Sequence, residues 1–255
     1  MPEIRFHGDL SELVETRASR PPRRAFPRAA KDLVETLGIP HTEVGRIEVN
    51  GKERDLLDPV GYDDRLDVFP HVLPRPSPWN PQGACPQTGP VAFVADINVG
   101  GAGRLLRLMG FDTLMDPGLE DREIALKAEK EYRVVLSRDR NLLKRRIVRW
   151  GCLLRKNRPW EQLGEVMTEY GLWDQARPFT RCTRCNTTLA PVEKERVMDL
   201  LEPMTRLYYD SFNSCPSCGK VFWRGSHTGR ILCRIRSMLG ESENPGGPAG
   251  YQACK

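Results

Sequence analysis

The sequence lacks a long hydrophobic run, because no stretch approaches the roughly 18 apolar residues that a membrane-spanning helix needs. It also lacks a charged segment followed by an apolar one near Met1, which is the pattern of a secretory leader. Histidine is scarce, and Cys152 has no His nearby in the sequence that could activate it, so we interpret Cys152 as a core thiol. We therefore expect a cytoplasmic protein with no membrane partner.

The net charge of +5 is also small, and by itself it describes solubility more than partners. The distribution of charge is uneven, however. Nine Lys and Arg residues fall between Arg138 and Arg158, where Asp139 is the one acid. This cluster predicts a positive surface that binds phosphate groups, so nucleic acid is the expected partner. The alternative interpretation is a helix face whose charges are only solvated.

Eight cysteines would suggest disulfides in an exported protein, but four of them form two C-x-x-C pairs. Cys182 and Cys185 make the first pair, and Cys215 and Cys218 make the second. In a reducing compartment this spacing predicts one tetrahedral zinc ion, and Gly219 supplies the backbone freedom that the second turn needs. The zinc is expected to be structural, because four thiolates leave no position open for water. A redox-active C-x-x-C pair is the alternative.

Residues 4–69 follow the pattern of a small α+β domain. We predict a strand at Ile4, a helix over 31–37 ended by Gly38, and strands over 46–49 and 65–69. Asn50-Gly51 predicts a hairpin turn. The segment resembles the β-grasp, ubiquitin-like fold of the sulfur-carrier proteins. Those carriers use a free C-terminal Gly-Gly, whereas here the last strand continues into a Pro-rich linker, so sulfur carriage is not expected.

A regular alternation of apolar strands and helices follows the linker. We predict strands over 91–95, 111–115 and 133–136, helices over 102–109 and 121–131, and a basic helix after Asp139. Strands that alternate with helices predict a mostly parallel sheet that is covered on both faces.

Carboxylates stand at the ends of these predicted strands. Asp96 follows the first strand and Asp139 the third, and ligands of open α/β sheets bind at the carboxyl ends of strands. Glu120, Asp121 and Glu123 lie where a loop enters the next helix, so they are candidates for the same crevice. Clustered carboxylates select magnesium or manganese, which can activate water against a phosphodiester. The alternative is that Asp96 and Asp121 only cap helices.

Several motifs in order carry a family resemblance. They are Phe93-Val94-Ala95-Asp96, Gly100 with the segment 104–113, Asp121-Arg122-Glu123-Ile124 and the segment 133–140, followed by both cysteine pairs and the segment 222–227. Together they resemble the PIN-like RNase family named for the C-terminal domain of the Mut-seven exonuclease, over residues 91 to 232. In many bacterial members a ubiquitin-like domain precedes the RNase domain. The chain departs at Ala102-Gly103, where the family usually has Leu-Ala, and at Ser137, where it usually has threonine.

The resemblance implies that Asp96, Asp121 and Asp139 bind the catalytic magnesium or manganese ion, with Glu123 as a fourth candidate. Basic side chains are expected to hold the RNA strand, and His227 either lines the cleft or serves as a structural hydrogen-bonding group. The candidate RNA-binding residues are Arg104, Arg107, Arg138, Arg140, Lys144, Arg145, Arg146 and His227.

We therefore predict an α/β protein with a β-grasp domain (1–72), a Pro-rich linker (73–90), a PIN-like parallel-sheet RNase domain (91–178), a zinc ribbon (179–235) and a disordered tail (236–255). The predicted function is metal-dependent hydrolysis of RNA, with transfer RNA and ribosomal RNA as candidate partners. The alternative is a non-catalytic zinc-ribbon module that binds RNA or the ribosome. A third interpretation is an adaptor whose β-grasp surface binds a protein partner.

Overall fold

The computed structural model describes residues 2–15, 25–76 and 91–238, without the side chains of Ser226, His227 and Arg236. The chain forms two compact units. Unit 1 comprises Met1–Leu106 and Phe111–Gln175, and unit 2 comprises Arg107–Gly110 and Ala176–Lys255. Among the helices of these described ranges, none is long and apolar enough to span a bilayer.

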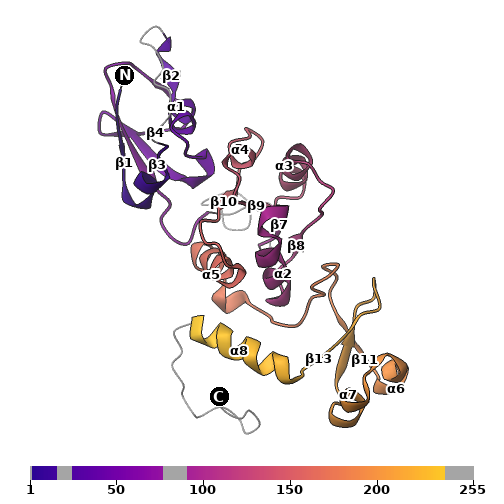
Figure 1. The fold of residues 1–255 in the computed structure, drawn as a ribbon. Coiled ribbons are helices and arrows are strands. Elements are labelled where there is room, and N and C mark those ends of the chain that lie inside the picture. The colour runs from indigo at the N-terminus through magenta and orange to yellow at the C-terminus, as the bar shows by residue number, and fades with distance from the viewer. Residues whose placement is uncertain (1, 16–24, 77–90, 239–255) are drawn as a thin grey trace. The chain divides into compact units, whose positions relative to one another are not determined.

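A four-stranded sheet organises the N-terminal region of unit 1, residues 2–76, in the order β1-β6-β3-β4 (Figure 1). β1 runs parallel to β6, whereas β3 pairs antiparallel with β4 and β6. Asn50 and Gly51 both have positive φ (52° and 76°), as a type I′ hairpin turn requires. The predicted strands, helix and turn are therefore confirmed. The elements are β1 (Glu3–Phe6), η1 (Gly8–Leu13), β2 (Arg28–Ala29), α1 (Ala30–Thr36), η3 (His41–Glu43), β3 (Val44–Val49), β4 (Lys52–Arg54), β5 (Pro59–Val60) and β6 (Arg65–Pro70).

A second four-stranded sheet, all parallel, lies in residues 91–175 of unit 1 in the order β10-β9-β7-β8. Every residue of β7, β9 and β10 is buried, as expected when both faces of a parallel sheet are covered. The predicted alternation of strands and helices is confirmed. The elements are β7 (Phe93–Ala95), η4 (Ile97–Val99), α2 (Gly100–Leu108), β8 (Thr113–Leu114), α3 (Asp121–Lys130), β9 (Val134–Ser137), α4 (Arg140–Leu143), β10 (Gly151–Leu153), α5 (Pro159–Glu169) and η5 (Trp173–Gln175).

The basic segment between Arg138 and Arg158 does not form the long helix predicted for it. Helix α4 ends at Leu143, and the chain then enters β10, a strand that the charge pattern concealed. Leu142, Val148 and Cys152 are each at most 1% exposed, so the segment is held in the core at three separated points. Lys144, Arg145, Arg146 and Arg149 lie between these points on a turn and loop, and the other basic residues lie before Leu142 or after β10, so they do not share one helix face. Cys152 is a core thiol, as predicted.

The close packing around Gly103 explains why this chain has a glycine at that position of the family pattern. An added Cβ there would lie 2.4 Å from the sulfur of Met115 and 3.0 Å from the Cβ of Ala95 on β7. Helix α2 therefore approaches β7 closely, and Met115 fills the space that an alanine methyl group would occupy. The glycine lowers helix propensity by about 0.5 to 1 kcal/mol but allows this packing.

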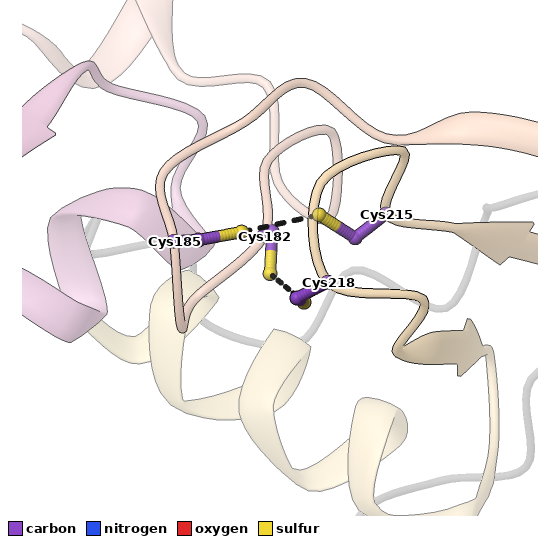
Figure 2. A group of neighbouring side chains, drawn as sticks. All are labelled: Cys182, Cys185, Cys215 and Cys218. Carbon is purple, nitrogen blue, oxygen red and sulfur yellow. Dashed lines mark hydrogen bonds between the residues drawn. The ribbon is translucent and has the colours of Figure 1, made fainter.

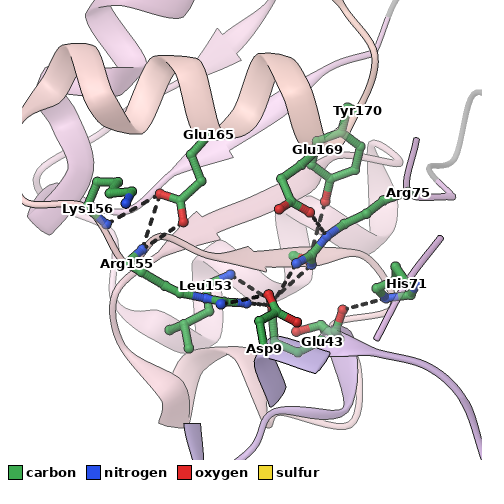
Figure 3. Close-up of polar contacts among 12 residues, drawn as sticks. Asp9, Glu43, His71, Arg75, Leu153, Arg155, Lys156, Glu165, Glu169 and Tyr170 are labelled. Atoms are coloured by element: carbon green, nitrogen blue, oxygen red, sulfur yellow. Dashed lines mark hydrogen bonds and ion pairs between the residues drawn. The ribbon is translucent and has the colours of Figure 1, made fainter. Parts of the chain in front are cut away.

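Arg75 lies within the predicted linker, yet it is buried. Its guanidinium donates two hydrogen bonds to Glu43 (3.1 and 2.8 Å) and forms an ion pair with Glu169 on α5 (Figure 3). Glu43 also accepts a hydrogen bond from the backbone N–H of Leu153, at 2.8 Å, on the edge strand β10. Residues 73–76 are thus part of the fold of unit 1, and the remaining residues of the predicted linker, 77–90, lie outside the described residues.

One hydrophobic core joins the two parts of unit 1. Leu13, Leu33 and other buried residues of the N-terminal region pack in the same cluster as Val135 and Leu142 of the parallel-sheet region. The Glu43 carboxylate of the N-terminal region accepts a hydrogen bond from the backbone N–H of Leu153 on the edge strand β10. Without this bond the N–H would be free to pair with another chain. The N-terminal region is therefore packed as a fixed part of unit 1.

Unit 2 is built on a three-stranded antiparallel sheet in the order β11-β12-β13. A small hydrophobic cluster packs against this sheet, with Val197, Leu201 and Phe212 as its buried members. Helix α8 includes residues 236–238 of the predicted disordered tail, and residues 239–255 lie outside the described residues. The elements are β11 (Ala190–Val192), α6 (Lys194–Val197), η6 (Met198–Leu200), α7 (Pro203–Tyr208), β12 (Phe212–Ser214), β13 (Val221–Trp223) and α8 (Ser226–Met238).

Substitution of Gly110 by alanine is expected to destabilise unit 2 by about 1 to 3 kcal/mol, because Gly110 has a φ of +96°. An added Cβ would also lie 2.5 Å from the carbonyl oxygen of Arg177. Thermal unfolding of the full chain measures the effect. Gly100→Ala is the matched control, since a Cβ there meets nothing within 4 Å and the backbone is helical. Equal melting temperatures for the two variants would contradict the prediction.

Candidate active site and metal centre

The order of the parallel sheet creates a crevice between β7 and β9. From β7 the chain crosses to β8 on one side, and β9 and β10 lie on the other side. Ligands of open α/β sheets bind outside the carboxyl ends of the strands where the direction of winding reverses. Asp96 directly follows β7, and Ser137 ends β9 two residues before Asp139. The topology therefore brings the first and third predicted carboxylates to the same edge of the sheet.

The Ser137 hydroxyl connects these two acidic positions. It donates a hydrogen bond to Oδ2 of Asp96 at 2.7 Å and accepts one from the backbone N–H of Asp139 at 2.8 Å. The side-chain amide of Asn98 also donates to Oδ2 of Asp96, at 2.6 Å, and its oxygen accepts from the backbone N–H of Arg138 at 3.2 Å. Asp96 is 7% exposed, so this polar network holds a buried carboxylate. Burial of polar oxygens costs free energy unless they are hydrogen-bonded, and this network supplies the bonds.

Asp139 is the N-cap of α4. Its Oδ1 accepts a hydrogen bond from the backbone N–H of Asn141 at 2.7 Å, which satisfies one of the free donors at the start of the helix. This cap fixes the rotamer of the carboxylate beside the Asp96 network. The predicted cap at Asp96 does not form, since its side chain makes no cap hydrogen bond to η4.

Asp121 and Glu123 have other partners. Asp121 is the first residue of α3 and forms an ion pair with Arg145 at 3.6 Å. Glu123 belongs to a capping box with Glu120: its carboxylate accepts a hydrogen bond from the backbone N–H of Glu120 at 2.9 Å. Among the described residues, the four cysteines are the one group of three or more His, Cys, Asp or Glu whose ligand atoms all lie within 4.8 Å of one another. The three predicted aspartates thus do not form one compact ligand set, although the Asp96 carboxylate and the backbone N–H of Asp139 share the Ser137 hydroxyl.

The predicted RNA-binding residues divide by their surroundings. Arg104, Arg138 and Arg146 are exposed, and Lys144 is half-buried. Arg107 is 3% exposed, and its guanidinium donates to the carbonyl oxygens of Thr183 and Arg184. Arg140 is bound by the N-terminal region, and the side chain of His227 lies outside the described residues. The exposed cations are the ones placed to meet a phosphate chain.

The four cysteines converge as predicted. Figure 2 shows their side chains pointing toward a common centre from two loops. The Sγ atoms of Cys182 and Cys218 are 3.8 Å apart, and those of Cys185 and Cys215 are 3.1 Å apart. Tetrahedral zinc with Zn–S bonds of about 2.3 Å separates its sulfurs by about 3.8 Å. The described geometry is therefore of the right size for one zinc ion.

The two cysteine loops have the same backbone conformation. In each loop the residue after the second cysteine, Asn186 or Gly219, has a φ of 69°. Its backbone N–H donates to the carbonyl of the first cysteine at 2.9 Å in both loops. Only glycine and, less readily, asparagine adopt this left-handed conformation at low cost. The local sequence thus shapes both loops before any metal binds.

The chemistry of the sulfur cluster calls for a cation. Burial raises the pKa of the Cys182 thiol, whereas the hydrogen bond with Cys215 lowers the pKa of the Cys185 thiol. Four thiolates this close repel one another strongly unless a positive ion lies between them. Zinc is the ion that four cysteine sulfurs in tetrahedral arrangement fit best, so the cluster could hold a zinc ion.

Sequence reasoning overlooked Asn98 and the structural role of Arg107. Asn98 stands two residues after Asp96, and an amide so close to a candidate ligand is a usable signal for a side chain that orients it. Arg107 gave no such signal, because its carbonyl partners are 76 and 77 residues away in the sequence.

Comparisons with known proteins agree with this arrangement. The family model described as the Mut7-C RNAse domain matches residues 91–235, and the one described as Mut7-C ubiquitin matches residues 1–75. A human protein described as "Exonuclease mut-7 homolog" is 47% identical over 38 residues, which is 15% of this chain. The chain spans only 4% of that protein's length. No solved structure matches the chain.

Proposed function

The chain belongs to the Mut7-C RNAse domain family, and from this premise we propose that it is a PIN-like ribonuclease that hydrolyses RNA phosphodiester bonds with a carboxylate-bound divalent metal ion. The ubiquitin-like N-terminal domain and the cysteine cluster accompany this activity. The observation that carries the proposal is the hydrogen-bonded set of Asp96, Ser137 and Asp139 at the crevice between β7 and β9.

The donor atoms at this crevice suit magnesium or manganese. Asp96 and Asp139 offer carboxylate oxygens, and Ser137 and Asn98 add a hydroxyl and an amide beside them. Hard oxygen donors of this kind are the ligands that these ions prefer. The hydrogen bonds that Asn98 and Ser137 donate to the Asp96 carboxylate both end on its Oδ2 atom.

Each group at the crevice has a separate role. A divalent ion held there would lower the pKa of a water molecule and offset the charge that builds on a cleaved phosphodiester. Asp96 and Asp139 would hold the ion, while Ser137 and Asn98 keep the Asp96 carboxylate in position. Arg104, Arg138, Lys144 and Arg146 attract the RNA backbone, which gives affinity without reading its sequence.

The cysteine cluster has a structural role in this proposal. A zinc ion bound by four thiolates has no open position, so it folds unit 2 and takes no part in cleavage. Phe222 and Trp223 on β13, next to Lys220, provide rings on which unpaired bases can stack. We assign unit 2 to RNA binding.

Cleavage of labelled single-stranded, hairpin and transfer RNAs in manganese tests the proposal. We expect the parent chain to cut RNA only with the metal, and Asp96→Asn and Asp139→Asn to reduce the rate at least about 100-fold, because each removes charge that holds the ion. Asp199→Asn, an exposed acid of unit 2, is the matched control and should cut normally. A parent that binds RNA and never cuts it would overturn the assignment.

A non-catalytic RNA-binding module is the second candidate. The Asp121–Arg145 ion pair and the Glu120–Glu123 capping box favour it, because these acids then stabilise α3 and bind no metal. Under this alternative Asp96→Asn and Asp139→Asn would bind RNA as tightly as the parent chain, and neither the variants nor the parent would cut it.

A further inference from the structure

Arg140 belongs to the basic segment, yet its side chain reaches the N-terminal domain. Its Nη1 donates to the carbonyl oxygen of Leu13 at 2.7 Å and to that of Gly38 at 3.2 Å. The same atom lies 3.2 Å from a carboxylate oxygen of Glu15. Three acceptors from two segments of the ubiquitin-like domain thus surround one end of the guanidinium, whose side chain is 29% exposed.

The residue before Arg140 is the candidate metal ligand Asp139. Both lie at the start of α4, a helix of four residues. The backbone of this single turn is closed by the hydrogen bonds from Asn141 N–H to Oδ1 of Asp139 and from Lys144 N–H to the carbonyl of Arg140. A helix this short is not stable by itself in water. The position of the Asp139 carboxylate therefore depends on what holds the turn from outside.

Besides the hydrogen bond from the Asp139 N–H to Ser137, two further contacts hold the turn. Leu142 and Leu143 are fully buried on its inner side, which fixes its depth in the fold. Arg140 fixes its other side by the hydrogen bonds to Leu13 and Gly38. These carbonyl oxygens belong to backbone whose position is set by the core that both parts of unit 1 share.

We propose that Arg140 is a positioning residue through which the ubiquitin-like domain holds α4, and with it the Asp139 carboxylate, in the geometry that binds the divalent ion. The proposal rests on the proposed function, since it concerns the same metal ligand. It replaces the expectation that Arg140 contacts RNA. The ubiquitin-like domain then acts as a structural part of the catalytic site, in addition to any partner it binds.

The test compares the full-length parent with Arg140→Ala, Arg140→Lys and Arg146→Ala. Arg146 is the matched control, because it lies in the same basic segment and is exposed. Manganese affinity is measured by electron paramagnetic resonance, backbone mobility by hydrogen exchange of residues 139–144, and cleavage by kcat and KM for a labelled RNA. Thermal unfolding identifies any variant that fails to fold. If Arg140→Ala fails to fold, Arg140→Lys, which keeps the positive charge, takes its place in the comparison.

We expect Arg140→Ala to weaken manganese binding about 10-fold, as loss of a group that orients a metal ligand usually does. Hydrogen exchange at residues 139–144 should become faster, and kcat should fall while KM stays unchanged. Arg140→Lys should recover part of the manganese affinity, because a lysine can still reach one carbonyl. Arg146→Ala should raise KM and leave manganese binding and hydrogen exchange as in the parent.

Two results would overturn the proposal. In the first, Arg140→Ala raises KM and leaves manganese affinity unchanged, which would make Arg140 an RNA contact. In the second, exchange at residues 139–144 and manganese affinity both match the parent. If the parent itself binds no manganese and cuts no RNA, the proposed function fails. Hydrogen exchange then decides separately whether Arg140 holds α4.

Discussion

Cys215→Ser is expected to abolish zinc binding and to unfold the three-stranded sheet of unit 2. The hydrophobic cluster beside this sheet is small, with Val197, Leu201 and Phe212 as its buried members, and small domains with little core often need a bound metal ion to fold. Binding of a structural zinc ion supplies about 10 kcal/mol or more to domains of this kind. Cys215 also lies between β12 and β13, so its loop joins two neighbouring strands of the sheet.

Zinc content by atomic absorption and circular dichroism of the full chain measure this result. The parent should carry one zinc ion per chain, and a chelator should reproduce the effect of the substitution. Ser217→Ala is the matched control in the same loop, because its hydroxyl hydrogen-bonds Thr187 and it is not one of the four clustered cysteines. A Cys215→Ser chain that keeps zinc and native secondary structure would show that the cluster is not a structural zinc site.

Glu43→Ala is expected to destabilise unit 1 by about 3 to 5 kcal/mol, because it breaks a buried ion pair and leaves the charge of Arg75 with Glu169 as its remaining carboxylate partner. The Glu43 side chain is 0% exposed and accepts from Arg75 and from the backbone of Leu153. Figure 3 shows the guanidinium groups of Arg75 and Arg155 reaching this site from opposite directions. The same substitution also exposes the N–H of an edge strand, which favours aggregation.

Urea unfolding of the full chain gives this free energy. Glu48→Ala is the matched control, because Glu48 also pairs with an arginine of the N-terminal domain but at the surface. Surface ion pairs contribute about 0 to 1 kcal/mol, so the control should lie close to the parent. If Glu43→Ala cost no more than Glu48→Ala, the buried contact between the N-terminal domain and β10 would not stabilise unit 1.

Local sequence patterns predicted most of the elements around the candidate site. The apolar runs of β7 and β9, the Asn50-Gly51 turn and the paired cysteines each depend on interactions within a few residues. Strand β10 and the helix α5 that follows it were not predicted. Strand β10 is three residues long and lies within a charged segment, which concealed it. Its burial comes from pairing with β9, a contact that the segment's own sequence does not encode.

The sequence by itself determined the alternation of strands and helices, the places of Asp96 and Asp139 after their strands, and the four cysteines that could hold a zinc ion. Only the tertiary structure decided which charged side chains face solvent. It placed Arg75, Arg107 and Arg140 against carbonyl or carboxylate oxygens and paired Asp121 with Arg145. The physical reason is that helical and strand periodicity follow from neighbouring residues. The partner of a long charged side chain, in contrast, depends on which distant backbone the fold brings within hydrogen-bonding distance.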